Sequence, residues 1–271
     1  MDYKIIVDSC ADITPEMARE LEITTVPLHL RLGQSEFMDD NNLDLNQFMQ
    51  LMADCKDGAG SSAPSPASFV DAMTDDGFVV TISSELSATY QSATLGAQDA
   101  DANVHVFDSK SASAGQTLIA VKLRELIANK LPKPQIIESV NKFIDDMKTY
   151  FVIEKFDNLI KNGRMSAMKG KIASVLNMKL LLGSDGMGKI SLHAKARNTK
   201  QMLEKMLGFI SASGRKTTGE NLVISHVNNI KLAEQLANMV RERFDFKKIF
   251  IVPTRGTSTL YANDQGIIIA F

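Results

Sequence analysis

Short apolar runs alternate with segments of helical periodicity along the first half of this chain. Four runs have the length and the β-branched or apolar composition of strands: residues 3–7, 26–32, 78–82 and 104–107. Helical patterns lie between or after them, and the two longest cover about 116–128 and 134–148. Because strands alternate with helices here, the pattern predicts a mostly parallel sheet with helices packed on it.

The pattern changes near residue 149. Further strands are expected at residues 150–154, 189–197, 222–226, 248–252 and 266–271, and further helices at 199–212 and 231–244. We therefore predict two α/β domains, residues 1–150 and 151–271, with a junction near 148–160.

The run at 78–82 ends in a loop rich in hydroxyl groups. Ser83, Ser84 and Ser87 follow the strand directly, and a helical pattern begins just after them. Free backbone N–H groups at a helix N-terminus favour an anion, and neighbouring hydroxyls add donors without adding charge. The three serines are therefore candidate ligands of an anionic group. The alternative is that Ser84 or Ser87 only caps the helix, as serines commonly do.

A second hydroxyl-rich stretch covers residues 58–66, where small residues and prolines predict a loop. Ser65 precedes Pro66 and is most simply the N-cap of the next helix. Ser61 and Ser62 have no such role, so we regard them as better candidates for ligand donors.

Composition narrows the class of protein. Of the 271 residues, 44% are hydrophobic and 23% are charged, as in globular proteins, and the formal charge of −2 gives no support for binding nucleic acid. Cys10 and Cys55 lack the spacing of metal ligands or of a disulfide framework. We therefore expect neither a metal nor a cofactor. No signal peptide and no apolar run of 18 residues is found, so we expect a cytoplasmic protein.

Two motifs suggest enzymes, but each lacks its context. Residues 183–189 match most of a phosphate-binding loop, yet Ile190 replaces the magnesium-binding hydroxyl and a strand follows, so a hairpin turn at Asp185 and Gly186 is favoured. Ser166 and Lys169 have the Ser-x-x-Lys spacing of acyl enzymes without its companion motifs.

Several segments together resemble the DegV family of bacterial fatty-acid-binding proteins, which includes the substrate-carrying subunit of fatty acid kinase. The most specific segment is Ile82-Ser83-Ser84-Glu85-Leu86-Ser87-Ala88-Thr89-Tyr90, which is similar to the family's Ser-Ser-x-Leu-Ser-Gly-Thr-Tyr. The other segments are similar in the same order: Val7 to Asp12, Val26-Pro27-Leu28, Ser61 to Ser65, Asp108-Ser109, Lys161 to Ser166, Asp185-Gly186 and Lys195-Ala196-Arg197.

The resemblance implies a two-domain α/β fold, with a mostly parallel N-terminal sheet, a mixed C-terminal sheet and a long-chain fatty acid between them. Hydroxyls matching Ser61 and the loop of Ser83 and Ser84 would hold the carboxylate. Arg164 and Arg197 match positions near the domain interface and the face that docks a kinase. In that scheme the chain is not itself an enzyme: it presents the acid to a separate ATP-binding subunit, with transient membrane contact compatible with this role.

The chain departs from the family pattern at its C-terminal motif. A histidine expected there is Tyr261, and Asn263-Asp264-Gln265 replaces the usual Gly-Pro-Gly turn. Tyr261 can still donate a hydrogen bond through its hydroxyl, so we include it among the ligand candidates. Asn162 also replaces the first glycine of a family Gly-Gly-Arg.

Physical chemistry supports a lipid independently. Burying about 14 methylenes contributes on the order of 11 kcal/mol before ordering costs. Uncharged hydroxyls and backbone N–H groups then suffice to orient one carboxylate, and a cation is not required. The alternative is a stand-alone enzyme, an esterase or small-molecule kinase, that uses Ser84 or residues 183–189. A DNA-associated regulator is a third hypothesis, and the net charge argues against it.

Overall fold

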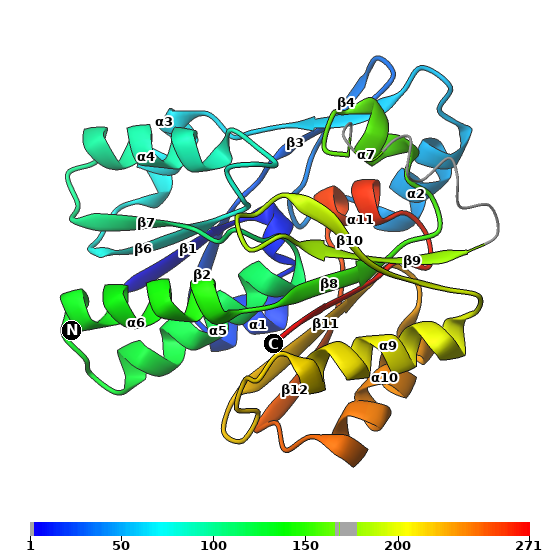
Figure 1. The fold of residues 1–271 in the computed structure, drawn as a ribbon. Coiled ribbons are helices and arrows are strands. Elements are labelled where there is room, and N and C mark those ends of the chain that lie inside the picture. The colour runs from blue at the N-terminus through cyan, green and yellow to red at the C-terminus, as the bar shows by residue number, and fades with distance from the viewer. Residues whose placement is uncertain (1–2, 166–167, 169–177) are drawn as a thin grey trace.

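Three sheets organise the chain in the computed structural model, which describes residues 3–165, 168 and 178–271 (Figure 1). The first is a parallel sheet in the order β2-β1-β6-β7. Its strands are β1 (Lys4–Asp8), β2 (Ile23–Val26), β6 (Gly77–Thr81) and β7 (Val104–Asp108). The predicted mostly parallel N-terminal sheet is therefore confirmed.

Helices cover both faces of this sheet (Figure 1). They are α3 (Pro66–Ala72) and α4 (Thr89–Asp99) on one face, and α5 (Ala114–Ala128) and α6 (Lys133–Asp146) on the other. Successive residues of a strand point to opposite faces, so Ile5 and Val7 join the core of α5 while Ile6 joins the core of α3 and α4. This two-sided burial explains the continuous apolar runs of the sequence.

A small antiparallel sheet corrects one prediction. The single strand predicted at residues 26–32 is wrong, since β2 ends at Val26 and a separate strand begins at His29. Pro27 between them has no N–H to donate to a ladder. The backbone N–H of Leu28 instead binds Ser9 Oγ at 3.0 Å. The new sheet has the order β4-β3-β5 and consists of β3 (His29–Leu32), β4 (Ser35–Met38) and β5 (Ala59–Ser62), beside α2 (Leu45–Asp54).

The second half of the chain builds a mixed sheet of order β10-β9-β8-β13-β11-β12, as expected. Only β11 and β12 pair in parallel among the described strands of this sheet. The strands are β8 (Thr149–Val152), β9 (Lys179–Ser184), β10 (Ile190–Ala196), β11 (Asn221–His226), β12 (Lys248–Pro253) and β13 (Ile267–Ala270). Helices α9 (Thr199–Ala212) and α10 (Ile230–Arg243) cover one face.

The other face of the mixed sheet packs against α5, which therefore lies between the two larger sheets. Leu118 and Leu123 of α5 share one apolar core with Val223 of β11 and Ile268 of β13. Strand β7 belongs to the parallel sheet and β8 to the mixed sheet, but this apolar core is continuous between the two sheets. The division into domains at residue 150 stays a prediction.

Short helices complete the chain. They are η1 (Ser9–Ala11), α1 (Pro15–Glu20), α7 (Asp157–Lys161) and α11 (Gly256–Ala262). Thr14, Asp44 and Ser65 each accept a backbone N–H of the helix they precede, so the cap predicted at Ser65 is confirmed. Helix α11 packs against η1, α2, α7 and β5, so it joins both ends of the sequence.

Candidate functional site

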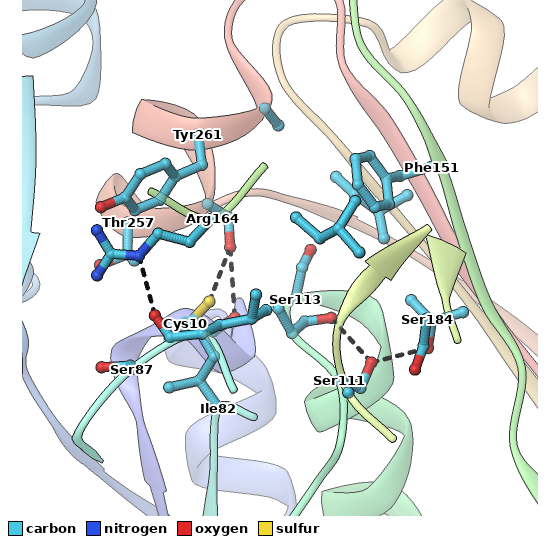
Figure 2. A pocket seen from close by; sticks show the side chains of 18 of the residues that line it. Cys10, Ile82, Ser87, Ser111, Ser113, Phe151, Arg164, Ser184, Thr257 and Tyr261 are labelled. Atoms are coloured by element: carbon cyan, nitrogen blue, oxygen red, sulfur yellow. Dashed lines mark hydrogen bonds between the residues drawn. The ribbon is translucent and has the colours of Figure 1, made fainter. Parts of the chain in front are cut away.

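A cavity lies where the two halves of the chain meet (Figure 2). The void encloses about 850 Å³, including the part open to solvent, and the centre of a water molecule can occupy about 110 Å³ of it. Apolar side chains from both halves form much of its wall: Leu28, Ile82, Phe151, Leu159, Ile190 and Ile268. The cavity is thus a narrow apolar space.

One group of polar side chains lies at the side of this cavity next to α11 (Figure 2). Ser61 Oγ and Tyr261 Oη lie 3.0 Å apart, although 200 positions separate them in sequence. The Arg164 guanidinium lies over the Tyr261 ring, 5.6 Å from its centroid. Ser87 and Thr257 lie in the same region (Figure 2), and Ser258 of α11 also lines the cavity. Two residues that were separate ligand candidates, Ser61 and Tyr261, are therefore direct neighbours.

Backbone carbonyls fix the orientation of Arg164. Its Nε donates to the Leu86 carbonyl at 3.0 Å and its Nη1 to that of Asn162 at 2.8 Å. Among the residues that the structure describes, no carboxylate forms an ion pair with it, so its positive charge is available to an anion in the cavity. The sequence argument did not require a cation at the site, but the cavity wall contains this one.

Asn162 has a structural role that accounts for its place beside Arg164. Its Nδ2 donates to the carbonyls of Ala59 and Asn158 at 2.7 and 2.8 Å. Gly60 leaves the necessary space, because a Cβ there would lie 2.8 Å from Asn162 Oδ1. Asn162 therefore connects α7 to β5, the strand that carries Ser61.

The serines of the predicted loop separate into different environments. Ser87 lines the cavity, whereas Ser83 is buried and donates to the Gly188 carbonyl at 2.9 Å. Ser84 is exposed and its hydroxyl donates to Asp108 at 2.5 Å. Ser62 is exposed at the end of β5 and does not line the cavity. Ser84 does not cap α4, whose N-cap residue is Ala88. Ser87 Oγ lies 2.9 Å from Thr89 Oγ1 and accepts the N–H of Thr89, the first residue of the helix, at 3.4 Å, so Ser87 contacts the start of α4 as well as lining the cavity.

Two buried carboxylates underlie the cavity wall. Asp8 accepts from the backbone N–H groups of Cys10 at 3.0 Å and Ile82 at 2.6 Å, and from Gln116 Nε2 at 3.1 Å. Burial raises the pKa of Asp8 to about 6 despite these donors. Burial likewise raises the pKa of Asp12, to about 7. Both carboxylates hold the loops that carry wall residues.

Sequence reasoning missed several wall residues. Thr257 and Ser258 follow β12 and begin α11, which is the same signal of hydroxyls after a strand that selected Ser83 to Ser87. The α11 N-terminus itself is occupied, because Asp39 accepts from the N–H groups of Gly256 and Thr257 at 2.8 and 2.7 Å. Cys10 also lines the wall, with its Sγ 3.7 Å from Ser258 Oγ.

Arg197 lies elsewhere. It borders an open groove along α9 together with Lys195, Lys200 and Lys205, and does not line the cavity. The two predicted docking arginines are therefore not in one site.

The enzyme motifs find little support. Residues 183–189 belong to the β9–β10 hairpin, where Asp185 Oδ1 accepts from the N–H groups of Met187 and Lys189, so the predicted turn is confirmed. Ser166 and Lys169 lie outside the described residues.

Over the described ranges, no cluster of three or more acidic, cysteine or histidine side chains could hold a metal ion. No helix within those ranges is long and apolar enough to cross a membrane.

The chain is similar to known proteins over its whole length. The sequence pattern of a family described as "Uncharacterised protein, DegV family" matches residues 2–270. A DegV domain-containing protein of Streptococcus gordonii is 31% identical over 280 residues, which cover 100% of this chain and 99% of the relative.

Two solved structures are similar in fold and sequence. A DegV family protein of Ruminococcus gnavus, described with vaccenic acid, has a TM-score of 0.95 and 37% sequence identity. The match covers 100% of this chain and 99% of the Ruminococcus gnavus chain. The fatty acid kinase (Fak) B3 protein of Streptococcus pneumoniae, loaded with linoleic acid, has a TM-score of 0.90 and 31% identity with the same coverage. With the family pattern, these matches show that the chain belongs to the DegV family.

Proposed function

We propose that this protein binds a long-chain fatty acid, with the acyl chain in the cavity between the two larger sheets. The observation that carries the proposal is the narrow apolar cavity with Arg164, Ser61, Ser87 and Tyr261 gathered at one side. A long apolar chain with a single anionic group matches that distribution of surfaces. The fatty acids bound by the solved relatives support the same ligand class.

The carboxylate would be held by Arg164 together with hydroxyl groups. Arg164 keeps N–H donors beyond the two that its carbonyl partners occupy, and hydrogen bonds between charged groups are stronger than neutral ones. Tyr261, Ser61 and Ser87 supply neutral donors nearby. Ser62, Ser83 and Ser84 have less support as direct contacts, since they are exposed or already donate to protein acceptors.

We further propose that the protein is a non-catalytic carrier that presents its acid to a separate ATP-dependent kinase subunit. The name of the pneumococcal relative, a protein of fatty acid kinase, supports such a partner. The basic groove with Arg197 is the proposed docking face, and the cytoplasm, where ATP is available, the proposed location. Arg197→Ala should then slow phosphorylation of the acid by the kinase while leaving the acid affinity unchanged.

Identification of the bound lipid tests the first proposal. Recombinant protein is purified without added lipid and its mass is measured before and after denaturation. We expect about one equivalent of a long-chain acid to be released. The same measurement on an Ile268→Arg variant, which places a charge in the cavity wall, is the matched control and should give little acid. Purified protein that neither carries nor takes up a long-chain acid would contradict the proposal.

A further inference from the structure

A pair of hydroxyl groups lines the cavity away from Arg164. Ser111 Oγ and Thr149 Oγ1 lie 2.7 Å apart, and both residues belong to the wall. Figure 2 shows Ser111 on the opposite side of the cavity from Arg164, Ser87 and Tyr261. The pair is therefore separate from the groups proposed to hold the carboxylate.

The fold makes specific room for this pair. Ser111 comes from the loop between β7 and α5, and Thr149 begins β8, so the two halves of the chain supply one hydroxyl each. Gly115 of α5 leaves the space, because a Cβ there would overlap the Ser111 hydroxyl and lie 2.9 Å from Thr149 Oγ1. Ser111 and Thr149 are only 4% and 7% exposed, so their hydroxyls face the cavity instead of bulk water.

The pair retains hydrogen-bonding capacity. Each hydroxyl has one proton and two lone pairs, and only one proton is needed for the bond between them. The other described partner of the pair is the Ala112 carbonyl, 3.4 Å from Ser111 Oγ, which is long for a bond between oxygen atoms. One proton and several lone pairs can therefore serve an oxygen atom in the cavity. A plain methylene chain has no oxygen atom that could bind to this proton or these lone pairs.

Neighbouring wall hydroxyls differ in this respect. Ser113 donates to Asp12, and Ser184 donates to the Lys110 carbonyl at 3.2 Å and accepts from Gly186 N. The Ser113 proton has a carboxylate acceptor, and the Ser184 proton has a carbonyl acceptor that lies closer than the Ala112 carbonyl lies to Ser111. Ser111 and Thr149 are thus the pair best suited to contact an oxygen on the ligand.

We propose that the preferred ligand is a fatty acid that carries a hydroxyl group along its chain, remote from the carboxylate, and that Ser111 and Thr149 bind this hydroxyl. The inference rests on the proposed fatty acid binding and specifies its substrate class. A ligand hydroxyl can accept the spare proton and donate in return, whereas an unsubstituted chain leaves that proton with its long contact.

The test compares affinities for stearic acid and for the positional isomers of hydroxystearic acid by isothermal titration on delipidated protein. We expect one isomer with a hydroxyl in the middle or distal part of the chain to bind about fivefold more tightly than stearic acid, the gain of one net hydrogen bond. The 2-hydroxy isomer should show no such gain. Thr149→Val, which keeps the shape of the side chain, should abolish the preference and leave the stearic acid affinity within about twofold.

Thr259→Val is the matched control. It also removes a buried threonine hydroxyl, paired with Thr254 at 2.8 Å, but this hydroxyl does not line the cavity, so the preference should persist. Wild-type protein that binds stearic acid but prefers no hydroxylated isomer would overturn the inference and leave the proposed function intact. A preference that survives in either Thr149→Val or Ser111→Ala would also overturn it. Protein that binds none of the acids would overturn both proposals.

Discussion

Tyr261 retains a hydrogen-bonding group at the position where the family pattern led us to expect histidine. Its hydroxyl contacts Ser61 at 3.0 Å and its ring packs against Arg164, so it can orient both. Tyr261→Phe removes only the hydroxyl. We expect a threefold to tenfold loss of fatty acid affinity by titration calorimetry, about the size of one neutral hydrogen bond. An unchanged affinity would place the carboxylate away from Tyr261.

Arg164 should contribute more than Tyr261, because it provides charge as well as donors. Arg164→Gln keeps a polar side chain but removes the cation, and we expect at least a tenfold loss of affinity together with a weaker dependence on salt. Arg197→Gln removes the same charge in the α9 groove and should bind the acid as the wild type does. Equal losses in both variants would indicate a general electrostatic effect and contradict a head-group contact at Arg164.

The sequence allowed only part of this site to be predicted at the level of residues. Ser61, Ser87 and Tyr261 were predicted from hydroxyl-rich segments and family resemblance, and they do line one cavity. The approach of Arg164 to Tyr261 was not predictable, because it depends on how α7 packs against α11. Likewise, exposure separates Ser62 and Ser84 from their neighbours, and a local pattern does not specify which of two adjacent hydroxyls faces inward.

At the level of elements, predictions succeeded where local signals were complete. Helix α9 has the predicted bounds 199–212, because an apolar stripe begins directly after the Asn198 cap. Strand β5 was predicted to be a loop, since its Ala-Gly-Ser-Ser sequence has low strand propensity. It is a strand because it pairs with β3, for example Ser61 opposite Leu30. Pairing with β3, and not local strand propensity, therefore determines that these residues form a strand.

The β9–β10 hairpin closes one wall of the cavity, and its turn offers a matched pair of glycines. Gly186 and Gly188 have φ angles of +93° and +97°, so alanine is strained at either position. Gly186 has open space around it, whereas a Cβ on Gly188 would overlap the Ser83 hydroxyl. Only Gly188→Ala should therefore displace the hairpin from the loop after β6.

We expect Gly188→Ala to lower the free energy of unfolding by about 1–3 kcal/mol more than Gly186→Ala does, because overpacking adds to the backbone strain. Urea unfolding of the two variants measures the difference. Gly188→Ala should also release bound acid faster in a stopped-flow displacement assay. If the two variants unfold alike, the contact between the hairpin and Ser83 does not hold the wall.

On the scale of the whole molecule, Asp12 joins segments from both ends of the sequence. It accepts from the backbone N–H of Arg255 at 2.7 Å and from the Ser113 hydroxyl, so it connects the loop after η1 with the loop before α11 and the start of α5. Its side chain is fully buried. Desolvation outweighs these donors and raises the pKa of Asp12 from 3.8 to about 7.

This shift gives the stability of the protein a definite pH dependence. A carboxyl whose pKa is raised by folding binds its proton more tightly in the folded state, so its stabilising effect is complete below pH 3.8 and is lost as pH rises through 7. Asparagine in Asp12→Asn does not titrate. The free energy of unfolding of the wild type minus that of Asp12→Asn should therefore fall by up to about 4 kcal/mol between pH 4 and pH 8. Urea unfolding across this range measures the difference, and a difference that stays constant or rises with pH would show that burial does not control this carboxylate.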